Sequence, residues 1–246
     1  MIEIKNLTKS FGDNLIWEDV SFKIEDGETL AVIGKSGCGK SVFLKHLNAL
    51  LYPDSGKVVI DGKNIFDLDY SELRLMRQRF GILFQGGALF DSISTFENIA
   101  FPLRYFTNDS EDDIKKKVQE ALEMVNLNEA GSKSTSELSG GMRKRVGLAR
   151  AIILKPDYLL YDEPTSGLDP QTSMEINELI VSMADSFDLT SIVITHDMHS
   201  VLSIAEKVAF LDSQKLSWFG SIDEMKNSEH PPLVEFTTAS EYKIKA

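Results

Sequence analysis

The sequence predicts an α/β protein with a mainly parallel sheet flanked by helices, an N-terminal antiparallel β-lobe and an inserted helical lobe. Short β-branched runs alternate with longer helical patterns along the chain. Several of these runs are apolar without alternation, which is typical of parallel strands covered on both faces. Seven strands are expected, at Ile2–Leu7, Leu30–Ile33, Val58–Ile60, Gly81–Phe84, Tyr158–Tyr161, Ser191–Ile194 and Val208–Leu211.

The first sixty residues differ from the remainder of the predicted sheet in having closely spaced turn signals. These lie at Phe11–Asn14, Glu25–Gly27 and Pro53–Gly56. Turn residues at such short intervals favour hairpins over crossover helices. We therefore expect the antiparallel β-lobe in this part of the chain.

The middle of the chain is mostly helical, from about residue 86 to residue 155. Within it, Ser110 followed by Asp113 is a helix-start signal, and the apolar residues after it recur on one helix face. These apolar residues are Ile114, Val118, Leu122 and Val125. We interpret residues 1–246 as one domain, with an α/β core at 1–85 and 156–227 and a helical lobe inserted at 86–155. The tail, 228–246, contains Pro231 and Pro232 and little periodicity; we assign it no fold, and a loosely packed arm is one interpretation.

Composition excludes some function classes. The chain has 246 residues, and its 26 basic and 38 acidic side chains give a net charge of −12, which disfavours general nucleic-acid binding. The single cysteine, Cys38, fits a reducing compartment. We predict no secretory signal and no membrane-spanning run of about 20 apolar residues, so work at a membrane would require another chain.

A glycine-rich segment, GKSGCGKS at Gly34–Ser41, lies between an expected strand and an expected helix. Glycines let the backbone turn its N–H groups toward phosphate oxygens, and the helix start adds the positive end of a dipole. Lys40 would neutralise the β- and γ-phosphates, and the hydroxyl of Ser41 would bind Mg²⁺. The residues predicted to contact nucleotide here are Gly34, Lys35, Ser36, Gly37, Cys38, Gly39, Lys40, Ser41 and Val42.

Polar residues at three other strand ends predict the rest of a hydrolytic site. Asp162 and Glu163 follow the apolar run YLLY, and beside a phosphate loop they are expected to hold Mg²⁺ and to deprotonate a water, respectively. Gln85 is placed to sense the metal or the water, and His196 to reach the γ-phosphate. The acids and the histidine have plainer alternatives: the acids could cap a turn, and the histidine could be structural.

A second glycine-rich helix start, ELSGGMRKRVGLAR at Glu137–Arg150, also has the design of an anion site. Together with the phosphate loop, Gln85, YLLYDE, SGLD and His196, it resembles in order and spacing the ABC-transporter ATPase family over essentially the whole chain. The resemblance implies that ATP and Mg²⁺ are bound, that Phe11 stacks on adenine, and that two subunits pair head to tail. Ser139, Gly140 and Gly141 would then bind the nucleotide of the partner copy, and Asp169 would lie at the interface. Met142 stands where the family usually has glutamine.

Gly81–Arg104 and the ending GSIDEMKNSEHP are similar to the ATPases of Mla-type systems, which move phospholipids or other hydrophobic molecules. That resemblance implies a separate membrane permease docking near Gln85–Phe101, a substrate-binding subunit in indirect contact, and a location on the cytoplasmic side of a bacterial inner membrane. The residues suited to the docking groove or its floor are Leu89, Phe90, Ile93, Phe96, Ile99 and Phe101. Alternatives are an importer of a polar solute such as an amino acid, a soluble ABC ATPase of translation or DNA repair, and a regulatory binder without turnover.

Overall fold

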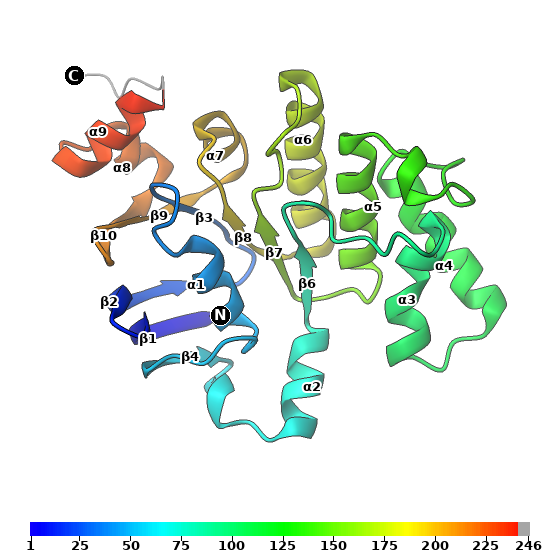
Figure 1. Ribbon diagram of the computed structural model, residues 1–246, viewed down its shortest axis with the longest axis horizontal. Helices are drawn as coiled ribbons and strands as arrows, with labels where there is room; N and C mark the ends of the chain where they lie inside the picture. The colour runs from blue at the N-terminus through cyan, green and yellow to red at the C-terminus, as the bar shows by residue number, and fades with distance from the viewer. Residues whose placement is uncertain (241–246) are drawn as a thin grey trace. The chain divides into compact units, whose positions relative to one another are not determined.

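The computed structural model describes residues 1–240, which pack as two compact units. The first unit joins residues 1–77 to residues 190 onward, and the second consists of residues 78–189. The predicted helical lobe, 86–155, lies within the second unit. The elements of both units are labelled in Figure 1.

The first unit contains an antiparallel sheet with strand order β2-β1-β4-β5 and a second group of strands in the order β10-β9-β3-β8. In this second group β3 pairs in parallel with both β8 and β9, whereas β10 runs antiparallel to β9. The elements are β1 (Ile2–Phe11), β2 (Asn14–Ile24), β3 (Thr29–Ile33), α1 (Lys40–Leu47), β4 (Ser55–Ile60), β5 (Lys63–Asn64), the 3-10 turn η1 (Ile65–Asp67), α2 (Tyr70–Gln78), β8 (Thr190–Ile194), α7 (Met198–Ile204), β9 (Lys207–Asp212), β10 (Lys215–Ser221), α8 (Ile222–Lys226) and α9 (Pro231–Ala239).

The second unit has two parallel strands, β6 and β7, and most of the helical residues. Its elements are β6 (Phe80–Leu83), α3 (Thr95–Phe106), α4 (Glu111–Met124), the 3-10 turn η2 (Thr135–Glu137), α5 (Gly140–Ile152), β7 (Tyr158–Asp162) and α6 (Pro170–Phe187). Ser110 caps α4 as predicted, because its hydroxyl accepts the backbone N–H of Asp113 at 3.2 Å.

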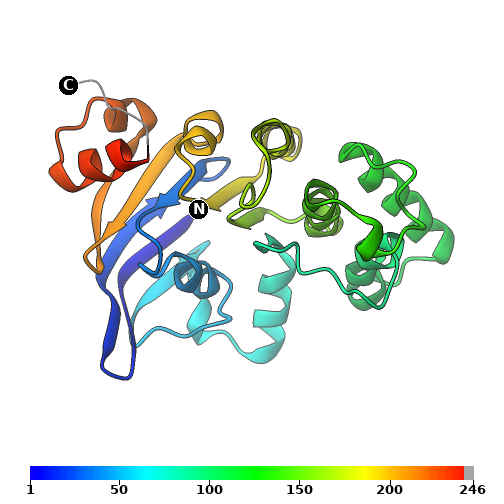
Figure 2. The same ribbon diagram turned by 45° about the horizontal axis from the view of Figure 1, so that its top comes forward.

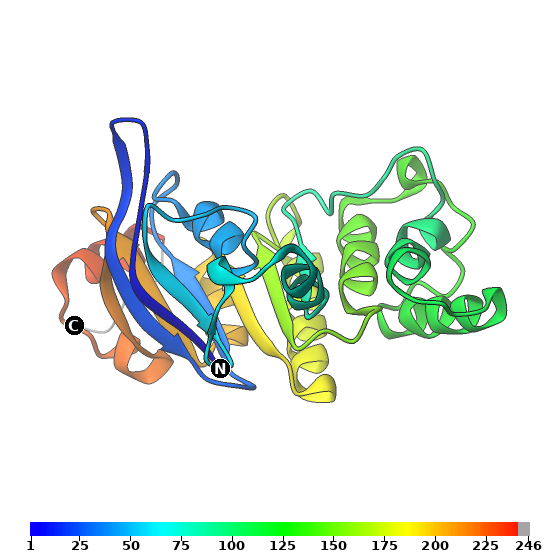
Figure 3. The ribbon, with the colours of Figure 1, turned by 90° about the horizontal axis from the view of Figure 1, so that it is seen from below.

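The α/β class, the parallel pairing and the N-terminal antiparallel lobe are confirmed, and each of the seven predicted strands overlaps an observed one. The hairpin of β1 and β2 is long and extends beyond its neighbouring strands (Figure 3). Strands β2, β5 and β10 were not predicted. In β2 the buried residues Trp17, Val20, Phe22 and Ile24 alternate only partly with exposed ones, because the hairpin has register shifts.

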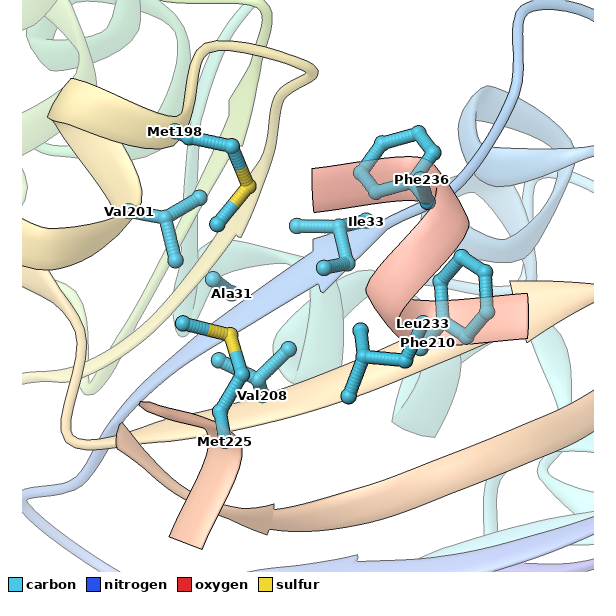
Figure 4. Close-up of a cluster of buried hydrophobic side chains, with 9 residues drawn as sticks. All are labelled: Ala31, Ile33, Met198, Val201, Val208, Phe210, Met225, Leu233 and Phe236. Carbon is cyan, nitrogen blue, oxygen red and sulfur yellow. The ribbon is translucent and has the colours of Figure 1, made fainter. Parts of the chain in front are cut away.

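The tail is where the structure corrects the sequence analysis. Residues 231–239 form helix α9 and not a loosely packed arm, and Leu233 and Phe236 on one face of it are buried. The last part of the tail, 241–246, lies outside the described residues. Figure 4 shows them against Ala31 and Ile33 of β3 and Phe210 of β9, together with side chains of α7 and α8. Figure 2 shows α8 and α9 together beside the antiparallel pair β9–β10. The prolines that suggested a loop instead occupy the first turn of the helix, where they cost no hydrogen bond.

Candidate nucleotide-binding and hydrolytic site

The phosphate loop of the first unit lies between buried β3 and the start of α1. Gly39 is the N-cap residue of α1, has φ 95° and makes no side-chain capping bond. A Cβ there would lie 2.3 Å from Nε1 of Trp17 and 2.4 Å from Cγ2 of Ile16, so only glycine fits. Trp17 also donates its indole N–H to the carbonyl of Cys38 at 3.3 Å. Strand β2 therefore contacts the phosphate loop through Ile16 and Trp17, and the sequence motif of the loop does not reveal this contact.

Lys40 is buried within this loop. Its Nζ donates to the carbonyl oxygens of Gly34 at 2.7 Å and Lys35 at 3.1 Å, and only 7% of the residue is exposed. These bonds hold the ammonium among the loop's backbone groups instead of in solvent. The residues predicted to face the ligand, Lys35, Ser36, Gly37 and Ser41, are exposed. Burial raises the pKa of the Cys38 thiol, which favours its neutral form.

The other predicted residues of the first unit are also accessible. Phe11 ends β1 at the tip of the hairpin with 48% of its surface exposed, and Lys9 Nζ lies 5.3 Å from its ring centroid. His196 is exposed in the short segment between β8 and α7. The next residue, Asp197, caps α7 by accepting the N–H of His199 at 2.9 Å and the hydroxyl of Ser200 at 2.6 Å. These bonds fix the backbone that carries His196.

In the second unit the acids follow β7 as predicted. Tyr158–Tyr161 are buried, whereas Asp162 and Glu163 are half-exposed at the strand end. Glu163 has φ 50°, a left-handed conformation that is uncommon for a residue with a Cβ. Gln85 follows the parallel neighbour β6, and its Nε2 donates to the hydroxyl of Ser166 at 3.3 Å. The structure thus joins Gln85 to the SGLD segment, a link that was not predicted.

The LSGGM segment forms the start of α5. Ser139 is exposed and caps the helix by accepting the N–H of Met142 at 3.2 Å. Gly141 is buried, and a Cβ there would lie 2.6 Å from Cγ2 of Thr172. Thr172 in turn bonds to Asp169 through its hydroxyl at 2.6 Å and its backbone N–H at 3.0 Å, and these bonds lower the pKa of the Asp169 carboxyl. Gly141 is therefore also needed for the packing of α5 on α6.

The predicted docking residues divide into two groups. Ile99 is fully buried and belongs to the core of the second unit. Phe90 and Phe101 are exposed by 45% and 44%, and their ring centroids are 5.0 Å apart. Leu89, Ile93 and Phe96 are half-buried. These contacts leave a small aromatic surface, to which the ring of Tyr105 adds at 6.4 Å from Phe101.

Three residues that organise this unit were missed by the sequence analysis. Asn98 is fully buried and holds the segment before α3 through both backbone groups of Phe90, with bonds of 2.8 and 3.0 Å. Lys144 and Arg150 of α5 bind backbone carbonyls of residues 85–88. No local signal marks Lys144, because Arg143 and Arg145 beside it are basic as well and only the fold shows which of the three is buried.

A strand, a glycine loop cradling a lysine, and a helix start define the class of the protein as a P-loop nucleotide hydrolase. The sequence profile described as ABC transporter matches residues 17–166, more than half of the chain. The chain therefore belongs to the ABC transporter family, and it is an ATP-hydrolysing subunit of that family.

Relatives and solved structures agree with this assignment. The chain is 43% identical over 235 residues to the probable ribonucleotide transport ATP-binding protein mkl of Mycobacterium leprae, covering 96% of this chain and 68% of that protein. It is 42% identical to the intermembrane phospholipid transport ATP-binding protein MlaF of Haemophilus influenzae, covering 96% and 89%. It is 41% identical to the methionine import ATP-binding protein MetN of Carboxydothermus hydrogenoformans, covering 96% and 71%.

Among solved structures, the dimeric ATP-binding cassette MJ0796 bound to ADP and Pi superposes with a TM-score of 0.83 at 30% identity, covering 90% of this chain and 99% of that one. CbiO1 of Clostridium perfringens, part of a transporter complex, superposes with a TM-score of 0.84 at 29% identity, covering 97% and 94%. Within residues 1–240 of the present chain, no helix has both the length and the apolar character that crossing a bilayer requires.

Proposed function

We propose that this chain powers the movement of phospholipids or other hydrophobic molecules by a separate membrane permease on the cytoplasmic side of a bacterial inner membrane. The observation that carries the proposal is the 42% identity to MlaF along almost the whole of both chains. The exposed aromatic surface of Phe90, Phe101 and Tyr105 supports it, because a permease helix needs an apolar surface on which to dock. A substrate-binding subunit would be in indirect contact, and nucleic acid is not a partner of this acidic chain.

The ATPase cycle that we propose uses two copies in head-to-tail arrangement. In each site Phe11 stacks on adenine, the loop Gly34–Val42 holds the phosphates, and Lys40 with His196 stabilises charge on the γ-phosphate. Ser139–Gly141 of the other copy completes the enclosure. Closure would then be transmitted through Gln85 to the permease. The dimeric MJ0796 cassettes support pairing of this kind.

Glu163 is proposed as the general base that takes a proton from the attacking water. Its left-handed backbone supports this role, since strained backbone conformations cluster at functional sites. Replacing the carboxylate by an amide would remove the base while keeping the size of the side chain.

Each of the three proposed metal ligands suits Mg²⁺ by its own chemistry. The hydroxyl of Ser41, the carboxylate of Asp162 and the amide oxygen of Gln85 are hard oxygen donors, which Mg²⁺ prefers, and Mg²⁺ commonly takes few protein ligands together with phosphate and water. The Nε2 of Gln85 donates to the hydroxyl of Ser166, and the amide oxygen is the atom that we propose as the metal ligand. When bound, the ion would neutralise phosphate charge.

The Glu163→Gln variant tests the hydrolytic half of the proposal. We expect turnover to fall by roughly 10²–10⁴, the range for a lost general base, with ATP affinity unchanged. The variant should also dimerise more persistently in ATP, measured by light scattering after gel filtration. Unchanged turnover would refute the role of Glu163.

The transport half is tested by purifying the chain with its native membrane partners and identifying the bound molecule by mass spectrometry. We expect phospholipid to copurify and ATP hydrolysis to rise when the complex is placed in lipid bilayers. The identity to MetN favours one alternative, an importer of a polar amino acid. Copurified amino acid without lipid would support that alternative and contradict lipid transport.

A further inference from the structure

Helix α5 contains a lysine to which the proposed cycle assigns no role. Lys144 is 4% exposed, yet it carries an ammonium group. Its Nζ donates to the backbone carbonyl of Glu163 at 2.9 Å and also to the backbone carbonyl of Gln85. One buried cation thus bonds directly to the residues that follow both strands of the second unit.

Burying this cation costs free energy, so its hydrogen bonds to the carbonyl oxygens are needed to keep it in the interior. A charged amine loses hydration when it is buried, and the loss is tolerated only where fixed oxygen atoms replace the water. Burial lowers the pKa of Lys144 to about 8, while the negative charges of Asp162 and Glu163 favour the protonated form. The ammonium therefore lies in the field of the same two acids that were predicted to handle the metal and the water.

The bonded carbonyl of Glu163 belongs to the turn with φ 50°. A left-handed residue with a side chain is strained and persists only where its surroundings enforce it. We propose that Lys144 is a positioning residue for ATP hydrolysis, which fixes the turn carrying Glu163 and the start of the Gln85 segment to helix α5. This inference rests on the proposed role of Glu163 as the base.

Two further contacts show that α5 holds the Gln85 segment along one helix face. A Cβ at Gly147, one turn after Lys144, would lie 2.6 Å from Cδ1 of Leu83. One turn later, Arg150 donates to the carbonyls of Gly87 at 2.7 Å and Ala88 at 2.8 Å. Residues at this spacing share a helix face.

The consequence concerns communication between the two nucleotides of a dimer. Ser139, at the start of α5, is proposed to meet the nucleotide held by the partner copy. Lys144 lies little more than one turn further along the same helix. A displacement of α5 on partner ATP binding would therefore move the bonded carbonyls, and with them Glu163 and Gln85. Lys144 would make each copy's hydrolysis depend on the nucleotide of the other.

The test compares Lys144→Met with Arg145→Met in the full-length chain. Arg145 is the matched control, because it is a mostly buried cation on the same helix that bonds to a backbone carbonyl, Val125 at 3.0 Å, and to Glu175, away from Glu163. We expect Lys144→Met to lower kcat by about 10- to 100-fold, the scale for misplacing a reacting group by about 1 Å. The Kd for ATP should change less than twofold, and Arg145→Met should keep kcat within about twofold of the wild type.

A double-mutant cycle separates positioning from general structural damage. If Lys144 acts through Glu163, Lys144→Met should slow Glu163→Gln by less than twofold further, and Lys144→Arg should recover kcat to within about threefold of wild type. Lys144→Gln replaces the methionine variant if the latter does not fold. Turnover of Lys144→Met within twofold of wild type, or equal losses in Lys144→Met and Arg145→Met, would overturn the inference. Normal turnover in Glu163→Gln would instead refute the proposed function on which it rests.

Discussion

Two helices of this protein begin with glycine-rich turns, and their starts are built in opposite ways. At α1 the cap residue, Gly39, has no side chain to bond the first N–H groups, and Lys40 is held among the loop carbonyls. At α5 the cap residue, Ser139, satisfies the helix through its own hydroxyl, and Gly141 packs against Thr172. By sequence alone, both helix starts have the pattern of an anion-binding site.

The comparison indicates that the two helix starts have different functions. Because the N-terminus of α1 has no side-chain cap, its backbone N–H groups are suited to a phosphate that supplies the missing acceptors. The start of α5 is already capped and anchored on α6, so it is suited to presentation as a stable exposed surface. We therefore expect α1 to determine whether nucleotide binds and α5 to determine whether bound nucleotide is hydrolysed.

The largest expected effect is at α1. Lys40→Ala removes the ammonium that is proposed to neutralise phosphate charge, so ATP affinity should fall by at least about 10²-fold, on the scale of a charged hydrogen bond or more. Isothermal titration with ATP and Mg²⁺ measures it. Lys45→Ala, at an exposed position of the same helix, should bind normally. Affinity within threefold of wild type in Lys40→Ala would show that α1 does not determine binding.

The next effect concerns the packing of α5. Gly141→Ala places a Cβ against the methyl group of Thr172, and overpacking of this kind costs about 1–3 kcal/mol. Thr172→Ser removes that methyl group, so the double variant should regain most of the lost stability in a denaturant titration. No recovery in the double variant would show that the clash with Thr172 is not the cause.

A smaller effect distinguishes a helix cap from a nucleotide contact. Ser139→Ala removes the cap of α5 and should cost about 1 kcal/mol of stability. Ser110→Ala removes the cap of α4, which has the same 3.2 Å bond length, and should cost a similar amount. Only Ser139→Ala should also lower ATP turnover, by about tenfold. Equal turnover in the two variants would mean that Ser139 serves only as a cap.

The smallest effect is a pH dependence at the end of α1. His46 is fully buried, and desolvation lowers its pKa, so the fold favours the neutral imidazole. Its contribution to stability should be complete above the unfolded pKa of about 6.5 and should be lost as pH falls below that value. Melting curves from pH 7 to pH 5 should show a smaller acid-induced drop for His46→Leu than for wild type. His199→Ala, at an exposed position, should behave like wild type.

Much of the fold was predictable because its signals are local. Fully apolar runs such as Leu30–Ile33 and Tyr158–Tyr161 can be satisfied only by burial on both faces, and they form β3 and β7. The amphipathic pattern and the Ser110 cap likewise predicted α4. Helix α9 escaped prediction because its two prolines obscured Leu233 and Phe236, whose burial depends on β3 and β9, distant in sequence.

The candidate site also has a part that the sequence predicts and a part that it does not. The phosphate loop and the strand-end acids are short motifs whose backbone demands are visible in their own residues, as with Gly39. The contacts of Trp17 with the loop and of Lys144 with Glu163 join residues 19 or more positions apart, and no local pattern specifies them. The long-range supports of a motif therefore had to come from the structure.

The central claim, that Ser139 of one copy meets the nucleotide held by the phosphate loop of another, is tested most directly by crosslinking. In a Cys38→Ser, Glu163→Gln background, Ser36→Cys and Ser139→Cys are carried on separately tagged copies that are mixed and treated with a short bismaleimide. We predict a crosslink between Ser36→Cys and Ser139→Cys copies that forms with ATP and is lost without it. A yield that is indifferent to ATP, or crosslinks only between two Ser139→Cys copies, would contradict the account.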